Sequence, residues 1–190
     1  MFRKTLILIL ATGLLAGFAG AALALFTDPA SIGANTFTTG TVDISTSPTS
    51  ALVTFSNMAP GDQVTAPVTV TNAGTLALRY AITSTATNAD GKNLMTQLVM
   101  TIKSGVTTCT NAGFGGSGTQ LYSGALGSVA GINVVGDPAS GAQAGDRNLA
   151  ASANETLCFN VLLPTSSGNT YQNATTTATF TFNAEQTANN

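Results

Sequence analysis

The chain has 190 residues, of which only 7% are charged and 6% aromatic, and it contains neither Trp nor His. Its hydrophobic content of 44% argues against a disordered chain, and its net charge of −2 leaves no basic patch that could neutralise nucleic-acid phosphates. Thr and Ser make up about a quarter of the residues, and Thr suits the solvent face of a strand. These features favour an extracellular protein and exclude nucleic acid as a partner.

Residues 1–24 are predicted to be a signal peptide. Arg3 and Lys4 form a positive start, an uncharged stretch follows, and Ala22-Leu23-Ala24 offers the small-x-small pattern that a signal peptidase requires. The alternative is a permanent anchor, since about 20 apolar residues can span a bilayer. The weak hydrophobicity of the stretch and the lack of a basic cluster after it favour cleavage near Ala24 or Leu25. We therefore expect a secreted or cell-surface protein that meets the membrane only before cleavage.

Period-two alternation of apolar and polar residues dominates the rest of the chain and predicts strands. Each predicted strand has an apolar face and a polar face, as two stacked antiparallel sheets require. The strands are expected over residues 64–71, 76–83, 98–103, 157–163 and 177–184.

Three turn signals separate these strands. Pro60-Gly61-Asp62 suits a type II turn, because Pro presets the first central residue and Gly accepts the positive φ of the second. Asn72-Ala73-Gly74 is expected to join two strands as a hairpin loop. Residues 88–91, Asn-Ala-Asp-Gly, close the next strand, and one helical turn is expected after them.

Residues 105–153 are rich in glycine and predict a long irregular insertion, with short strands at 120–123 and 129–135. Two cysteines, Cys109 and Cys158, are the whole complement, and an even count in an exported chain favours one disulfide. Such a bridge would stabilise the fold by roughly 4 kcal/mol on the chain-entropy model. The alternative, a reactive thiol, has no basic residue beside it in the sequence.

An ordered set of motifs resembles the TasA/camelysin family of secreted biofilm-matrix proteins, whose signals are cut by a dedicated signal peptidase. The resemblance covers residues 18 to 90 and the last 20 or so, whereas the middle, with both cysteines, departs from the pattern. The motifs are Ala-Leu-Phe-Thr-Asp at 24–28, Asn-Thr-Phe-Thr-Thr-Gly-Thr-Val-Asp-Ile at 35–44, Phe-Ser-Asn-Met-Ala-Pro-Gly-Asp at 55–62, Val-Thr-Asn-Ala-Gly-Thr-Leu-Ala at 70–77, Tyr-Gln at 171–172 and Phe-Thr-Phe-Asn-Ala-Glu-Gln at 180–186.

The resemblance implies an all-β, jelly-roll-like antiparallel β-sandwich that forms fibres, in which the N-terminal segment of one subunit completes the sheet of the next. Strand addition satisfies the unpaired backbone of an open edge, and a head-to-tail contact between copies propagates as a filament. Residues 25–35 are then a donor segment or a flexible tail, and 36–190 form one domain. The donor would lie between Leu25 and about Ile44, with its expected anchors at Phe26, Ile32, Phe37, Val42 and Ile44.

Catalysis is not expected, although camelysins have been classed as metalloproteases. A catalytic zinc site normally uses His, and a Ser-His-Asp or Cys-His nucleophile requires it. A Ser-Lys pair through Lys92 or Lys103 remains open, as does calcium at Asp137 and Asp146, although the spacing of a calcium loop is missing. We therefore expect no catalytic residue, cofactor or metal.

The sequence predicts a structural subunit of an extracellular fibre, in a biofilm matrix or a pilus-like assembly. Its main partner would be a second copy of itself, with other matrix components as further partners. The alternative is a monomeric cell-surface binding module, because jelly rolls also serve that role. The absence of Trp and the presence of only three Tyr argue against stacking on sugars.

Overall fold

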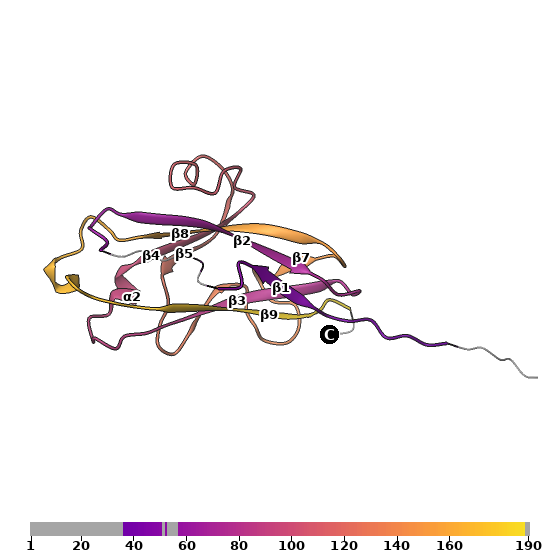
Figure 1. Cartoon of the computed structure of the whole chain (residues 1–190). Helices are drawn as coiled ribbons and strands as arrows, with labels where there is room; N and C mark the ends of the chain where they lie inside the picture. Colours follow the sequence, from indigo (N-terminus) through magenta and orange to yellow (C-terminus); the bar gives the residue numbers. More distant parts are fainter. Residues whose placement is uncertain (1–35, 51, 53–56, 189–190) are drawn as a thin grey trace, which may run out of the picture. The chain divides into compact units, whose positions relative to one another are not determined.

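The computed structural model describes residues 36–50, 52 and 57–188 (Figure 1). The chain divides into two units, residues 1–38 and 39–190. Of the first unit only residues 36–38 are described, and the Phe37 side chain there is 93% exposed. The predicted signal peptide and the expected anchors Phe26 and Ile32 lie outside the described residues. In the described part of the chain, no helix is long and apolar enough to cross a membrane.

The second unit contains two antiparallel sheets, which confirms the all-β sandwich class (Figure 1). The first sheet has the order β1-β2-β8-β4-β5, and in the second β3 pairs with β6 and β7 on one side and with β9 on the other. The first sheet contains β1 (Ile44–Ser47), β2 (Gln63–Asn72), β8 (Asn154–Leu162), β4 (Val99–Ser104) and β5 (Thr119–Ala125). The second contains β3 (Leu78–Ala86), β6 (Ile132–Val135), β7 (Arg147–Leu149) and β9 (Ala178–Gln186), and the connections hold α2 (Leu94–Gln97) and the short 3-10 helix η1 (Asn169–Tyr171).

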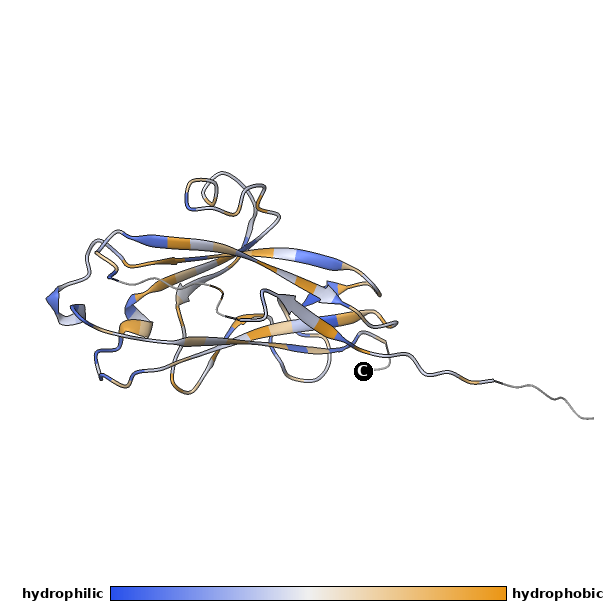
Figure 2. Cartoon of the chain, viewed as in Figure 1, coloured by the Kyte–Doolittle hydropathy of each residue, from blue (hydrophilic) through white to orange (hydrophobic). Residues whose placement is uncertain are grey.

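The core lies between the sheets and is built from the alternating apolar positions that the sequence predicts. Leu78 and Ile82 on β3 and Leu157 and Phe159 on β8 are almost completely buried. Apolar residues recur along these strands in Figure 2. Burial of each such side chain stabilises the fold by about 1.5–3 kcal/mol.

The prediction that every strand has one solvent face is wrong for the centres of both sheets. Arg79 and Ala81 on β3 and Cys158 and Asn160 on β8 point away from the core, yet all four are buried. Two loops from the middle of the chain lie against these outer faces: residues 105–118 are joined to Cys158 by a disulfide, and residues 137–140 lie beside Arg79 and Ala81. A loop from a distant part of the chain leaves no trace in the alternation of the strand that it covers.

The turn at residues 72–74 is not a hairpin, because β2 and β3 belong to different sheets. The Asn72 side chain is buried, donates to the carbonyls of Leu76, Leu149 and Ala150, and accepts the N–H of Gly74. These bonds tie the end of β2 to the end of β7. The chain therefore crosses from one sheet to the other at this point.

Two other turn predictions hold. The Asp62 N–H donates to the Ala59 carbonyl at 2.9 Å, and Gly61 has a φ of 100°, as a type II turn requires. Gly91 closes the turn after β3 by donating to the Asn88 carbonyl, and the helical turn α2 follows.

The expectation of a long irregular insertion at residues 105–153 is wrong in part. The predicted short strands correspond to β5 and β6, and the region also supplies β7, which the sequence did not predict. β7 has only three residues, too few to display an alternation. Residues from this region therefore extend both sheets as well as covering them.

Candidate functional site

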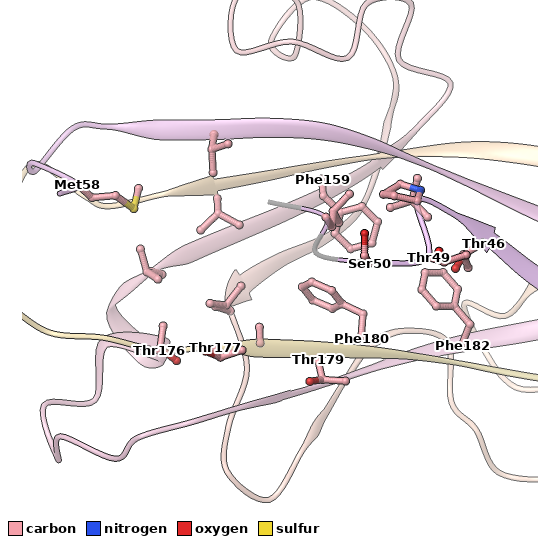
Figure 3. Close-up of a pocket in the computed structure, with 18 residues that line it drawn as sticks. Thr46, Thr49, Ser50, Met58, Phe159, Thr176, Thr177, Thr179, Phe180 and Phe182 are labelled. Atoms are coloured by element: carbon pink, nitrogen blue, oxygen red, sulfur yellow. The ribbon is translucent and has the colours of Figure 1, made fainter. Parts of the chain in front are cut away.

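An apolar groove of about 560 Å³ lies between the two sheets, where β1 and β2 border one side and β9 the other (Figure 3). Phe180 and Phe182 project into it from β9, and Phe159 lies opposite on β8. The Phe159 and Phe180 ring centres are 5.2 Å apart, which is a tilted aromatic contact. Val64 and Val68 of β2 continue the apolar lining on the first sheet. We call this space the groove.

The inner face of β9 is left incompletely covered at the groove. Ala178, Phe180 and Phe182 point inward, and Thr179 and Thr181 point outward, as the sequence predicts. Phe159 across the groove is 1% exposed, but Phe180 and Phe182 are only partly buried. An apolar face without a complete cover is where a partner gains most by binding. The alternation gave no signal of this, because covered and uncovered strands have the same pattern.

One edge of β9 lies beside the groove and pairs with no other strand among residues 36–50, 52 and 57–188. The Thr87 N–H donates to the Thr177 carbonyl, and the Thr187 N–H donates to the Ala77 carbonyl. The odd-numbered residues of β9 therefore form the hydrogen bonds of the β3–β9 ladder. The N–H and C=O groups of the even-numbered residues 178–186 must therefore face away from β3. Among the described strands, β9 pairs with β3 only. An unpaired edge of nine residues can template another strand.

The N-terminal segment is fixed to the domain at residues 41–43. The Thr41 carbonyl accepts the N–H groups of Thr75 and Leu76, both at 3.1 Å, and the Asp43 carbonyl accepts the Ala73 N–H. A Cβ on Gly74 would collide with the backbone of Thr41, so the close approach requires glycine there. Of the residues before Thr41, the described ones, 36–40, are all exposed.

The five expected anchors fall into three groups. Phe26 and Ile32 lie outside the described residues, and their role stays a prediction. Phe37 and Val42 are exposed, at 93% and 40%. Ile44 lies in β1, opposite Asn72 of β2, and packs against the core of its own chain. Ile44 is therefore already bound within its own subunit.

Two ion pairs lie on the sheets of the described part of the chain. Arg79 on β3 pairs with Glu185 on β9, and Arg147 on β7 pairs with Glu155 on β8. Hydrogen bonding to Glu155 raises the pKa of Arg147, and burial raises the pKa of Tyr80, whose hydroxyl donates to Glu155. These side chains hold strands together and leave the groove without a charged lining.

A family model described as camelysin metallo-endopeptidase matches residues 2–190, nearly the whole chain. No curated protein matches the chain.

The metal that this description implies does not fit the donors that the chain offers. The sequence has no His, and Cys109 and Cys158 are joined in a disulfide. Glu155 and Glu185 are held by arginines, and over residues 36–50, 52 and 57–188 no three His, Cys, Asp or Glu residues gather where they could hold an ion. A catalytic zinc site has three protein ligands. No reaction step through a metal can be derived from these residues.

Proposed function

The chain belongs to the camelysin family, and from that premise we propose that it is a structural subunit of an extracellular fibre, in a biofilm matrix or a pilus-like assembly. Each copy donates the segment before Thr41 to the groove of the next copy. The contact is head-to-tail, because donor and acceptor are different surfaces, so it propagates as a filament. No cofactor takes part.

The observation that carries this proposal is the combination of the groove, into which Phe180 and Phe182 project and which residues 48–50 also line, with an edge of β9 that no described strand pairs. A strand laid along this edge would form backbone hydrogen bonds with the even-numbered residues of β9 and place alternate side chains beside Phe180 and Phe182. One added strand would thus satisfy the edge and cover the apolar face together. This is the usual division in strand addition, where the backbone gives affinity and the side chains give specificity.

The length and spacing of the donor segment suit this role. Residues 25–40 span about 50 Å when extended, and β9 spans about 30 Å, at about 3.3 Å per residue. Phe26 and Ile32 are an even number of residues apart, so in a strand both side chains fall on the same face. Pro29 has the opposite parity, so in an antiparallel pairing its missing N–H would face away from β9 when Phe26 and Ile32 enter the groove.

A structural role is also proposed in place of peptidase activity, although the family description names a metallo-endopeptidase. The support is the donor chemistry, in which His is absent from the sequence and both thiols are consumed by the disulfide. We expect the purified chain to cleave an unstructured protein substrate at the background rate, with or without added Zn²⁺. Zinc-dependent cleavage by the chain would overturn this part of the proposal.

The fibre is tested by electron microscopy of two purified chains, one beginning at Leu25 and one at Asn35. We expect filaments from the first and monomers from the second, because the second lacks Phe26 and Ile32. Circular dichroism and thermal unfolding establish that both chains are folded. Monomers from both chains across a range of pH and concentration would refute the proposal and favour a monomeric binding module.

A further inference from the structure

A second sheet edge borders the groove, on β2. β1 covers β2 only as far as the pair Ser47 and Thr69. The Asn72 N–H donates to the Ala153 carbonyl, so the even-numbered residues of β2 bond to β8. The backbone groups of Gln63, Thr65 and Pro67 therefore face away from β8, on a side where no described strand pairs with them. A strand inserted in the groove could in principle pair with this edge or with β9.

Two features make the β2 edge a poor template. Pro67 has no N–H, so a strand added here would lose a hydrogen bond at one of these three outward-facing residues. The Gln63 carbonyl is already occupied, because the Asn111 side-chain amide donates to it at 2.9 Å. Asn111 belongs to residues 105–118, which we call the capping loop. The even-numbered residues of β9 include no proline, and no side chain of the described residues caps their backbone groups.

The capping loop is held on the outer face of the first sheet at three points. The Cys109–Cys158 disulfide joins it to β8, with 5.6 Å between the Cα atoms. The Lys103 ammonium donates to the Phe114 carbonyl at 2.9 Å and lies 4.6 Å from the centre of the Phe114 ring. The third point is the bond from Asn111 to Gln63. The disulfide and the Lys103 contacts thus hold Asn111 against the edge of β2.

We infer that the capping loop, locked by Cys109–Cys158, blocks strand addition along β2 and leaves β9 as the edge of the groove at which a second copy pairs. The inference rests on the proposed fibre function for its consequence, which is a filament that grows without branching. Natural sheets commonly protect one edge with a proline or a covering loop, so that pairing occurs only where it is wanted. Here both devices protect the same edge.

The test opens the β2 edge in three ways in the chain that begins at Leu25. Asn111→Ala frees the Gln63 carbonyl, Pro67→Thr restores an N–H to the edge, and Cys109→Ser/Cys158→Ser releases the loop. Asn169→Ala, at an exposed asparagine of η1, is the matched control. Each protein is examined by thermal unfolding, sedimentation and electron microscopy with mass-per-length measurement.

We expect wild type and the control to form single filaments, and the opened variants to form paired or branched ones with up to about twofold greater mass per length. If wild type forms no filaments, the fibre proposal fails, and the inference then requires the opened variants to dimerise where wild type stays monomeric. Self-association that is identical in wild type, Asn111→Ala and Pro67→Thr overturns the inference. The two single variants keep the test decisive even if loss of the disulfide prevents folding.

Discussion

The hydroxyl of Tyr80 on β3 donates a 2.8 Å hydrogen bond to Oε1 of Glu155 on β8, and this bond joins the two sheets. Arg147 on β7 pairs with the other oxygen of the same carboxylate at 2.6 Å. Tyr80 is 1% exposed, so its ionised form would lack solvent and would also lie against a negative charge. Burial first, and Glu155 second, raise the pKa of Tyr80 above its ordinary value.

The raised pKa of Tyr80 predicts a loss of stability in alkali. Below pH of about 10 the tyrosine is neutral in both the folded and unfolded states, and its contribution to stability is complete. Above that pH this tyrosine ionises in the unfolded chain but stays neutral in the folded chain. The free energy of unfolding therefore falls by up to about 1.4 kcal/mol per pH unit. We expect Tyr80→Phe to show a weaker alkaline decline than wild type in urea unfolding. Tyr171→Phe is the control, and an equal decline in all three proteins would contradict the prediction.

The disulfide predicts a large dependence of stability on oxidation. Cys109 and Cys158 are 49 residues apart in sequence, and on the chain-entropy model closing such a loop contributes about 4 kcal/mol. We expect Cys109→Ser/Cys158→Ser, and wild type in a reductant, to have a free energy of unfolding lower by about this amount and to unfold at a lower concentration of denaturant. The reductant should leave the double variant unchanged, which separates the disulfide from other effects of reduction. Equal unfolding midpoints for oxidised and reduced wild type would show that the bridge does not stabilise the fold.

The Asn72 side chain predicts a turn that tolerates substitution poorly. It is fully buried and bonds to three carbonyls and one N–H, so Asn72→Ala leaves several polar groups without partners. We expect a loss of about 1–3 kcal/mol in the free energy of unfolding. Asn169→Ala, at an exposed position, should change it by less than about 0.5 kcal/mol. Similar losses from both variants would mean that the crossing at residues 72–74 does not depend on these bonds.

The sequence predicted the strands well because each carries several alternating positions. β2, β3, β4, β8 and β9 all lie within a few residues of their expected ranges. β1 was not predicted, since Ile44 is the only apolar residue in its four positions. Local alternation reports which face of a strand is apolar, but it holds no information about what covers the other face.

The groove could not be predicted for a related reason. Phe180 and Phe182 alternate with polar residues much as the inward positions of β8 do, so the pattern predicts ordinary core residues. Whether a core strand is fully covered depends on which strands are neighbours, and β9 pairs with β3 from about 100 residues earlier. The hairpin expected at residues 72–74 failed similarly, because a short loop between two strands does not reveal whether they share a sheet.

The two orientations of backbone N–H groups in β9 predict opposite effects of proline at adjacent positions. The Ala184 N–H faces the free edge, so Ala184→Pro should keep the fold and lose filaments. The Asn183 N–H faces β3, so Asn183→Pro removes a bond of the β3–β9 ladder and should lower the unfolding midpoint markedly. Thermal unfolding and electron microscopy of both variants check this. A folded Ala184→Pro protein with normal filaments would show that β9 is not the acceptor edge.

If the N-terminal segment binds the groove of the next copy, a variant damaged in the segment and a variant damaged in the groove should bind each other when mixed. Phe26→Ser/Ile32→Ser should remove the donor's anchors, and Ala178→Phe should fill part of the groove, where the Ala178 side chain lines the space. Each variant alone should remain monomeric. In an equal mixture, the intact donor of the Ala178→Phe copy can enter the intact groove of the other copy, but neither remaining surface can continue the chain.

We therefore expect the mixture to give one-to-one dimers by sedimentation and no filaments by electron microscopy. Mixing each variant with wild type is the control, and each should shorten filaments by capping one end, with Ala178→Phe blocking the groove end and Phe26→Ser/Ile32→Ser the donor end. Monomers in the mixture would mean that the N-terminal segment and the groove do not bind each other. Filaments in the mixture would mean that subunits associate through a different pair of surfaces, since a head-to-tail contact with one damaged surface on every copy cannot propagate.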